Sequence, residues 1–517
     1  MGKIFKTKKL TTLAEALILV FGLAIVLGGV YYFSDNIKRG ESIMSNITGD
    51  KPDLILAYNT FPGMMGILYM NNGMEPNEDS ELFKRYGLKL KIVQMDEVKD
   101  TRDGLATGSL DVVYCTTDAL PVEMSNDGTL VNLGVKQFMK VNESRGADAV
   151  VAMSYINSVA DLKGKKVAYA VGTASNTLLI NLLETNNLSI NDIESYKVGN
   201  GIEAATAFKN GQCDAALVWA PDDEDCVAAV KNSKILVTTE TATQIISDGL
   251  LATSETIKEK RDLLISLVKA WTDGNAIIAN DQSAMAKANE LFSKGFNFPV
   301  DLVAATSHKI RYSTIGDNKQ FFGLDATFSG VTGEKMYSRM AVKYSESNLA
   351  KSPVAWRIAS TSDIIEGVLT DQTFCNKPEQ SAESAVSFNK PTQAEATKQA
   401  SGSKQVILNF AHDSFILSEE NKAIIDRDIV GVAQAFANAR IRVEGNTDNT
   451  GNYNYNVTLS QKRANAVVDY LVREYKFDSN KFVVVGNGPS KPVVGCESNS
   501  TEECRSKNRR TEFQFIW

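Results

Sequence analysis

Residues 445–467 read GNTDNTGNYNYNVTLSQKRANAV, and this stretch decides how the last part of the chain folds. Residues 440–444 (RIRVE) come directly before it and alternate between polar and apolar side chains, which predicts a half-exposed strand. Within the stretch, Asp448 lies in a segment rich in Asn, Thr and Gly, and Arg463 follows fifteen positions later. The stretch therefore supplies one acid and one guanidinium as candidates for a polar binding site.

Further strands are predicted on both sides of this stretch. Upstream, residues 405–411 (QVILNFA) form an apolar run of strand length, and Ser418 is expected to cap the start of a helix. Downstream, residues 483–489 predict a strand and a turn, and residues 508–513 lead into the last strand. We therefore expect one compact α/β unit over residues 405–517.

Four motifs of this unit occur in the order of a known family. They read T-D-x-x-G, N-x-x-L-S-x-x-R-A-x-x-V, G-x-G-x-x-x-P and N-R-R-x-E, and together they resemble the OmpA-like peptidoglycan-binding domain, an α+β fold. One departure is Asn446, where the family often has His before the Thr-Asp pair. That change alters a hydrogen-bond detail and leaves the charges in place. The resemblance implies that residues 405–517 bind the cell wall.

The charges fit a wall component that the resemblance names, the diaminopimelate of the stem peptide. This residue carries an ammonium and carboxylates on one small body. By resemblance, Asp448 would pair with the ammonium and Arg463 would hold a carboxylate through two parallel hydrogen bonds. Asn456 would add a polar contact, and Arg509 and Arg510 either contribute or are surface arginines. Without the resemblance, Asp448 could cap a loop and Arg463 could form a surface ion pair.

An α/β pattern runs from residue 53 to residue 375. Short apolar runs alternate with helical segments, and strands are predicted at 54–58, 88–94 and 165–170, with a further strand beginning in 108–114. Units of this kind build parallel sheets whose ligands bind beyond the carboxyl ends of the strands.

Residues 158–167 (SVADLKGKKV) resemble a segment of type 2 periplasmic substrate-binding proteins, in the branch that includes binders of sulfonates, taurine and thiamine precursors. Residues 109–112, 146–151 and 211–221 match further segments in the family's order. The resemblance implies two lobes that close on a small molecule about a hinge.

Candidate ligand residues lie where the predicted strands end. They are Asn59, Thr60, Thr116, Thr117, Thr173, Ser175, Trp219 and Asp222. Thr173 and Ser175 lie at a helix N-terminus, which suits an anion, although they could simply cap the helix. Trp219 could instead pack in the core, and residues 222–225 (DDED) could be a solvated turn or meet a cationic ligand group.

The N-terminal residues predict a single membrane span. Residues 10–33 are apolar and long enough to cross a bilayer, and four lysines precede them, which leaves the N-terminus in the cytoplasm. A cleaved signal peptide is the alternative, but no A-x-A site follows the apolar run. Glu15 is the exception within the span, and it either reaches the headgroups or binds an ion. In position it resembles the ion-binding carboxylate of MotB-type stator subunits, which usually have Asp.

The remaining segments divide the chain. We expect a cytoplasmic tail over 1–9, a connector over 34–52 and a flexible linker over 376–404, because the linker is rich in Ser, Ala, Gln, Glu and Lys. Cys496 and Cys504 flank a short polar loop and are expected to form a disulfide in an oxidising compartment. Cys213 and Cys226 could also pair, whereas Cys115 and Cys375 are left unassigned.

Composition excludes several classes of function. The chain has 517 residues and a net charge of −7, so it has no basic surplus with which to bind nucleic acid. His308 and His412 are its two histidines, which rules out a His-rich metal site. No nucleophile–base pair is visible, so we expect a binding protein with no cofactor rather than an enzyme.

Three functions remain open at this point. The first is a wall-anchored protein of the bacterial inner membrane that binds a small molecule of unknown identity. The second is a MotB-like subunit of an ion-driven membrane motor, with Glu15 as the ion-binding carboxylate, a multi-span channel partner and a homodimeric state. The third is a wall-tethered component of an ABC importer. In each case the chain is single-pass and most of it is periplasmic.

Overall fold

The computed structural model describes residues 51–125, 128–384, 386–408, 410–411 and 413–516. Within these ranges, no helix combines the length and the apolar character needed to span a bilayer. The membrane helix expected over residues 10–33, together with Glu15, lies outside the described residues.

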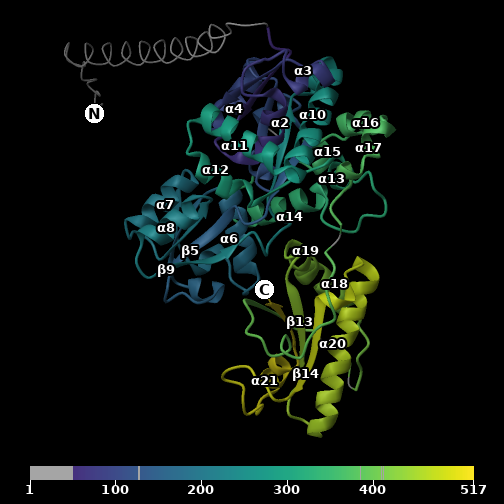
Figure 1. Cartoon of the computed structure of the whole chain (residues 1–517). Coiled ribbons are helices and arrows are strands. Elements are labelled where there is room, and N and C mark those ends of the chain that lie inside the picture. The colour runs from purple at the N-terminus through teal and green to yellow at the C-terminus, as the bar shows by residue number, and fades with distance from the viewer. Residues whose placement is uncertain (1–50, 126–127, 385, 409, 412, 517) are drawn as a thin grey trace, which may run out of the picture. The chain divides into compact units, whose positions relative to one another are not determined.

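The first lobe of the central domain begins with the purple segment of Figure 1 and is built on a six-stranded sheet with strand order β11-β4-β10-β3-β1-β2. Its strands are β1 (Leu54–Tyr58), β2 (Leu90–Gln94), β3 (Val112–Thr116), β4 (Lys136–Ser144), β10 (Ser247–Ala252) and β11 (Ile310–Tyr312). Strand β1 runs parallel to β2 and β3, whereas β10 is antiparallel to β3 and β4. The strands predicted at 54–58 and 88–94 are therefore confirmed, the second beginning at Leu90.

Helices cover this sheet and supply the largest buried side chains. They are α2 (Met65–Asn71), α3 (Glu81–Tyr86), α4 (Val98–Thr107), α5 (Thr129–Asn132), α9 (Ser254–Glu259), α10 (Arg261–Asn280) and α11 (Gln282–Phe296). Trp271 of α10 is fully buried, and its ring centroid lies 6.0 Å from that of Tyr58 at the end of β1. The fully buried β1 side chains and α10 therefore share one apolar core.

The second lobe is a five-stranded sheet with strand order β7-β6-β8-β5-β9. Its elements are β5 (Asp148–Met153), β6 (Lys166–Ala170), β7 (Glu194–Val198), β8 (Ala215–Trp219) and β9 (Ser233–Thr238), with helices α6 (Ala174–Glu184), α7 (Gly201–Lys209) and α8 (Asp222–Ala229). The strand predicted at 165–170 is confirmed as β6. The chain enters this lobe from β4 and returns to the first lobe through β10, so two crossings join the lobes.

Helices after β10 complete the central domain. They are α12 (Val300–Ser307), α13 (Ile315–Phe321), α14 (Gly333–Glu346), α15 (Trp356–Ala359), α16 (Asp363–Leu369) and α17 (Gln372–Cys375). Helix α14 packs on the first lobe at residues 120–122, and its Tyr344 hydroxyl lies 2.7 Å from Thr177 Oγ1 of the second lobe. This helix therefore contacts both lobes.

The C-terminal domain is a four-stranded sheet with strand order β12-β15-β13-β14. Its elements are β12 (Gly402–Val406), β13 (Arg440–Asn446), β14 (Phe482–Gly488) and β15 (Thr511–Ile516), with helices α18 (Glu419–Ile425), α19 (Gly431–Ala435), α20 (Tyr453–Tyr475) and α21 (Glu502–Asn508). Ser418 caps α18 as predicted, because its Oγ accepts a hydrogen bond from the Asn421 amide. The strand predicted at 405–411 lies earlier, at 402–406, where it pairs with β15.

Close packing of α20 on the sheet depends on glycine. A Cβ placed on Gly445 of β13 would lie 2.2 Å from the carbonyl oxygen of Ser460, and one on Gly486 of β14 would lie 2.7 Å from that of Val457. Only residues without a side chain allow the helix and the strands to approach this closely. The helix that carries Arg463 is thereby seated directly on the strand that precedes Asp448.

The half-exposed strand predicted at 440–444 is instead buried on both faces after its first residue. Glu444 is fully buried, and its carboxylate binds Arg442 Nε, Lys491 Nζ and Asn487 Nδ2, each at 2.7 Å. Arg442 in turn donates to the carbonyl oxygens of Glu395 and Lys398. Alternation failed as a guide because internal ion pairs, rather than water, satisfy the polar side chains.

The carbonyls of Glu395 and Lys398 belong to the segment predicted as a flexible linker. Part of that segment contacts the C-terminal sheet, since the carboxylate of Glu395 also lies 2.5 Å from Arg440 Nε. Earlier in the segment, Gln380 is buried and donates to the carbonyl oxygen of Thr272 in the central domain. Composition predicted the lack of an apolar core here, but not these polar contacts.

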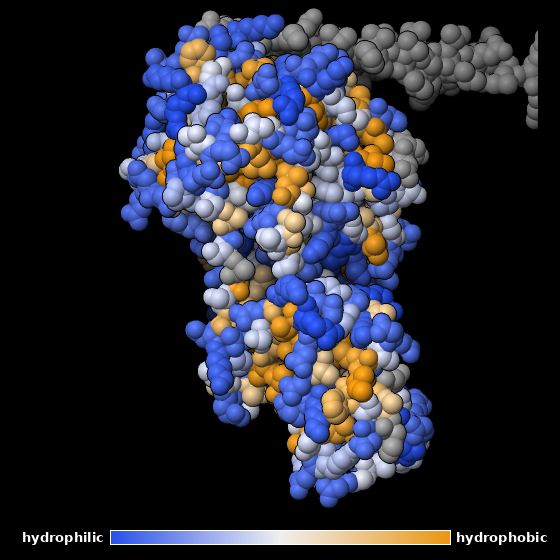
Figure 2. Space-filling view, turned by 90° about the vertical axis from the view of Figure 1, so that its right-hand side faces the viewer, coloured by the Kyte–Doolittle hydropathy of each residue, from blue (hydrophilic) through white to orange (hydrophobic). Residues whose placement is uncertain are grey.

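The surface of the described residues is mixed in polarity. Figure 2 shows a face on which hydrophilic residues predominate and hydrophobic residues form several separate patches. Of the large apolar side chains, Val494 and Ile416 are among the most exposed. Scattered exposure of this kind is ordinary for a folded domain and marks no site by itself.

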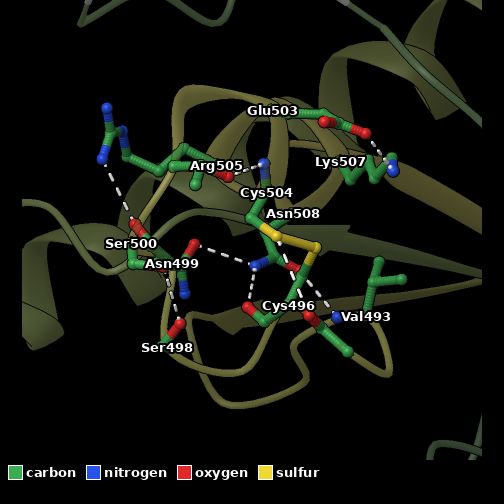
Figure 3. Close-up of a disulfide and its surroundings, with 12 residues drawn as sticks. Val493, Cys496, Ser498, Asn499, Ser500, Glu503, Cys504, Arg505, Lys507 and Asn508 are labelled. Atoms are coloured by element: carbon green, nitrogen blue, oxygen red, sulfur yellow. Dashed lines mark hydrogen bonds and ion pairs between the residues drawn. A yellow bond between two sulfur atoms is a disulfide. The ribbon is translucent and has the colours of Figure 1, made fainter.

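A disulfide joins Cys496 to Cys504, as predicted (Figure 3). Asn508, at the end of α21, donates from its side chain to the Cys496 carbonyl and accepts from the Val493 amide. The disulfide loop and α21 are therefore held as one unit. The possible Cys213–Cys226 pair is wrong: both thiols are free and buried in apolar surroundings, and Cys226 Sγ faces the Ala205 carbonyl instead.

We expect the double variant C496S/C504S to lower the free energy of unfolding of the C-terminal domain by about 2.5 kcal/mol, the loop-closure entropy of a short cross-linked loop. Urea denaturation followed by hydrogen exchange of β15 peptides measures this change. The C213S/C226S variant is the matched control and should lack an effect of this kind. Equal behaviour of the two double variants would contradict the prediction.

Candidate functional site

The acid and the guanidinium predicted in the C-terminal domain are neighbours in the structure. Asp448 lies in the loop after β13, and Arg463 lies on α20. The pKa of the Arg463 guanidinium is lowered because the group is buried and because Arg509 lies nearby, and Asp448 partly offsets this effect. The charges of Asp448, Arg463 and Arg509 are therefore close enough to influence one another.

Asp448 is held in place by two donors. Its Oδ2 accepts from Arg509 Nη1 at 2.7 Å, and its Oδ1 accepts from the Thr450 amide at 2.9 Å. Burial disfavours the charged carboxylate, but the hydrogen bonds from Arg509 and Thr450 and the positive charge of Arg509 together outweigh this effect and lower the pKa of Asp448. Asp448 is consequently an anion at neutral pH. Arg509 also bonds Glu502 at 2.6 Å, so it is not a free surface arginine.

Arg463 is packed through one end of its guanidinium. Its Nε donates to the Ser414 carbonyl at 3.0 Å, and the guanidinium lies 4.9 Å from the centre of the Phe410 ring. Within the described part of the chain, its two Nη atoms form no hydrogen bond and no carboxylate pairs with them. The structure thus presents a fixed guanidinium edge that is free to bind a carboxylate.

A cavity of about 120 Å³ lies beside these groups. It is lined by Leu408, Phe410, Gly445, Asn446, Arg463, Arg509, Arg510 and Thr511. Three arginines on its wall favour an anionic guest. Arg510 is buried in an ion pair with Glu512, and its Nη1 has no partner among the described residues. Asn456 donates to the Thr450 carbonyl and so holds the loop that carries Asp448.

The eight predicted ligand residues of the central domain differ in whether their side chains are already bonded within their own lobe. Three are occupied by their own lobes: Thr60 bonds Asp96, Thr117 bonds Gln137, and Thr173 Oγ1 donates to the Ala170 carbonyl rather than capping α6. Asn59 follows β1 and is half-buried, with its carbonyl accepting from the Phe61 amide. The remaining four residues lie on strand ends and helix starts.

Of these four, Ser175 and Trp219 keep polar atoms without partners in the described chain. The Trp219 ring packs against Gly201 at the start of α7, and Thr116 pairs with Asp248 across the sheet. Asp222 is half-buried and begins α8, so the expected solvated turn is a helix start. Its neighbour Asp223 is fully buried and bonds Lys309 of the first lobe at 2.8 Å.

Sequence reasoning missed three buried aspartates between the lobes. Asp118 directly follows Thr116 and Thr117, Asp148 begins β5, and Asp248 is the second residue of β10. Burial raises the pKa of Asp118 to about 7, that of Asp148 to about 7 and that of Asp248 to about 6. An acid at the end of an otherwise apolar strand was the available signal.

These three aspartates make a pH prediction. A carboxyl whose pKa is higher in the folded than in the unfolded chain binds more protons when folded, so stability falls as pH rises. The window runs from about pH 4, the unfolded value, to about pH 7. We expect the free energy of unfolding of the ligand-free central domain to drop by several kcal/mol between about pH 5 and pH 8. Tryptophan fluorescence in a urea titration reports mainly this domain, which holds Trp219, Trp271 and Trp356, three of the four tryptophans of the chain.

Glu143 has the opposite effect on stability, and its effect appears only at the acid end of this pH range. Burial opposes its ionisation, but Lys140, Arg145 and Arg311 outweigh burial and lower its pKa to about 2. Its contribution is present above its unfolded value and is lost only as pH falls below about 4. Stability that rises steadily from pH 5 to pH 8 would contradict the prediction, because the three aspartates would then be paired in a way the structure does not record.

The chain combines a two-lobed domain with an α+β domain that carries an arginine-lined cavity, and comparison with known families assigns each of the two. The family model described as NMT1/THI5 like matches residues 77–285, and the model described as OmpA family matches residues 409–509. The chain therefore carries an NMT1/THI5-like substrate-binding domain in its middle and an OmpA domain at its C-terminus. These two domains point to a location in the periplasm or cell envelope.

Individual relatives match parts of the chain. Outer membrane porin F of Pseudomonas aeruginosa is 33% identical over 196 residues, which are 37% of this chain and 52% of the relative. The peptidoglycan-binding protein ArfA of Mycobacterium tuberculosis is 37% identical over 103 residues, which are 20% of this chain and 30% of the relative. The chain thus spans about half or less of the length of these relatives.

Among solved structures, the periplasmic aliphatic sulphonate binding protein SsuA from Escherichia coli is similar to the central domain. The sequence identity is 19% and the TM-score is 0.48. The match covers 60% of this chain and 98% of SsuA.

Proposed function

We propose that the chain is a cell-envelope protein that binds peptidoglycan through its C-terminal domain and a small molecule through its central domain. The wall-binding half rests on one observation: Arg463, with its free Nη edge, lines the same cavity as Arg509, which bonds the anionic Asp448 at 2.7 Å. Diaminopimelate carries a carboxylate for the first group and an ammonium for the second. The OmpA family match supports the same conclusion.

Arg509 gives the site a way to release Asp448. In the unbound state Arg509 bonds both Asp448 and Glu502, at 2.7 and 2.6 Å. An arriving ammonium can take the place of one Arg509 hydrogen bond on Asp448, while Glu502 keeps Arg509 paired. Asp448 is therefore neither left unpaired before binding nor blocked during it.

Sedimentation with isolated sacculi tests the wall-binding half. The full chain in detergent should sediment with diaminopimelate-type sacculi, and free meso-diaminopimelate should release it. Cadaverine, which carries two ammonium groups and no carboxylate, should not compete. Failure to sediment, or equal release by cadaverine, would reject the assignment of both charges to this site.

The small-molecule half rests on the two lobes, their two crossings and the NMT1/THI5-like match. In one version of this proposal, the chain is the wall-tethered substrate-binding component of an ABC importer. Purification of the full chain from native membranes, with identification of co-purifying chains and metabolites, tests it. An ABC permease among the co-purifying chains would support the importer form, and no retained metabolite would count against small-molecule binding.

We further propose that residues 10–33 anchor the chain in the inner membrane with its N-terminus in the cytoplasm. The motor alternative adds that Glu15 binds an ion, and it requires a multi-span channel partner and a dimer. We expect Glu15→Gln to abolish ion-driven function in that case while leaving sacculus binding intact. A Glu15→Gln strain with unchanged envelope function would leave the carboxylate as a headgroup contact only.

A further inference from the structure

Three buried carboxyl groups between the lobes have no cationic partner among the described residues. Asp118 is fully buried, and Asp148 and Asp248 are 5% and 7% exposed. Other buried acids of the central domain have a cation: Asp223 binds Lys309, and Glu143 binds Lys140 and Arg145. Within the described ranges, no Lys or Arg forms an ion pair with Asp118, Asp148 or Asp248. Burying a carboxyl group without a cation is unfavourable, so the cluster requires a reason.

Strand pairing brings the three groups together. Asp248 of β10 pairs with Thr116 of β3, and Asp118 lies two residues further along the chain, where its Oδ1 accepts from the Ser247 amide at 3.4 Å. Asp148 begins β5, just past the crossing from β4. The charge of Asp148 raises the pKa of Asp118, and the charge of Asp248 raises the pKa of Asp148. The cluster therefore sits where the chain passes from one lobe to the other.

Donors of the first lobe line the same place. Asn142 Nδ2 donates to Asp248 Oδ2 at 2.9 Å, and a Cβ on Gly63 would touch Asn142, the Tyr58 hydroxyl and Asp248 together. Gly63 therefore packs directly against this polar corner, where there is no room for a side chain. Tyr58 and Asn142 are both almost fully buried. The corner is thus a polar place beside the apolar core of this lobe.

Unpartnered polar atoms provide an independent sign of a missing guest. Asp118 Oδ2 and Ser175 Oγ have no hydrogen-bond partner among the described residues, although the two residues are 0% and 1% exposed. Ser175 lies on the first turn of α6, the same helix as Thr177, whose hydroxyl acts to lower the pKa of Asp118. Buried polar groups are nearly always satisfied in native proteins, so these atoms mark a place for a ligand that donates hydrogen bonds.

We propose that the small molecule bound between the lobes is a cation with N–H donors, such as an ammonium or amidinium, and that Asp118, Asp148 and Asp248 recognise it. This inference rests on the proposed small-molecule function and fixes its charge class. The N-terminus of α6 alone would suit an anion, but three carboxyl groups outweigh one helix end. A sulfonate would lie beside these three carboxyl groups and would find no cationic side chain among the described residues with which to pair there.

Two probes of equal length and opposite charge test the inference. We expect 1-butylammonium to raise the melting temperature of the central domain in the full chain by at least about 3 °C, measured by tryptophan fluorescence, and 1-butanesulfonate to leave it unchanged. Asp248→Asn and Asp118→Asn should each weaken butylammonium binding by about 30-fold or more in a calorimetric titration. Glu290→Gln, an exposed acid on α11 with the same loss of charge, is the matched control and should bind as the unmodified chain does.

The outcomes separate the charge class from the function itself. Stabilisation by butanesulfonate, or butylammonium binding that survives both aspartate variants, would overturn the cation assignment while leaving small-molecule binding intact. If neither probe binds, the cation assignment also fails, and metabolites extracted from the natively purified chain decide the function: an anionic or neutral guest would keep it, and no guest would remove it.

Discussion

Arg463→Ala is expected to lower the affinity of the full chain for diaminopimelate-type sacculi by about 100-fold or more. The guanidinium is fixed by Ser414 and Phe410, so its free Nη edge needs no ordering before it binds a carboxylate. Loss of a buried, charge-assisted pair costs about 2–5 kcal/mol, and 100-fold corresponds to about 2.7 kcal/mol. A sedimentation isotherm with purified sacculi measures the change.

Two further variants make this experiment specific. Arg463→Lys keeps the charge but loses the planar fork, so we expect it to recover only a small part of the affinity. Arg473→Ala removes an exposed arginine from the same helix, which pairs with its neighbour Glu474, and this variant should bind as the unmodified chain does. Full recovery by lysine would show that a point charge suffices, against the bidentate geometry. A melting curve for each variant excludes loss of fold.

Glu444→Ala is expected to destabilise the C-terminal domain by about 3–5 kcal/mol. Glu444 is fully buried and takes hydrogen bonds from Arg442, Lys491 and Asn487. Removing the carboxylate leaves Arg442 charged, 5% exposed and short of its anion. Hydrogen exchange of β13 and β14 peptides in increasing urea measures the free energy of unfolding.

The double variant R442M/E444L separates charge burial from packing. Replacing both partners removes the unpaired charge, and Lys491 can turn its half-exposed side chain to water. We therefore expect the double variant to be more stable than Glu444→Ala alone. Glu474→Gln, an exposed acid on α20, is the control for loss of charge. A double variant no more stable than the single one would show that the carboxylate serves packing rather than the charge of Arg442.

The sequence predicted the four strands of the C-terminal domain and four of the eleven strands described in the central domain, because their signals are local. Runs such as 54–58 and the motif around Asp448 are apolar or turn-forming over a few residues, so nearby side chains suffice to recognise them. It did not predict the bond between Arg509 and Asp448, which are 61 residues apart and meet only when the fold is complete. Nor did alternation reveal the burial of Arg442, whose carbonyl partners lie in a segment without periodicity.

The same reasoning explains the missed aspartates. Asp118, Asp148 and Asp248 each stand beside an apolar strand, and one acid at a strand end is common on a surface. Their meeting depends on which strands are neighbours and on two crossings between sheets, which no short pattern encodes. Recognition of the family order predicted two lobes, but not the charge that faces the guest.

The position of β15 in the C-terminal sheet bears on how that sheet is completed. This strand is the last one described, yet it lies inside the sheet, between β12 and β13. Without residues 511–516, the edges of β12 and β13 that pair with β15 would therefore remain open. A chain that lacks this strand would have an incomplete C-terminal sheet, so the wall binding proposed above would require β15 to be in place.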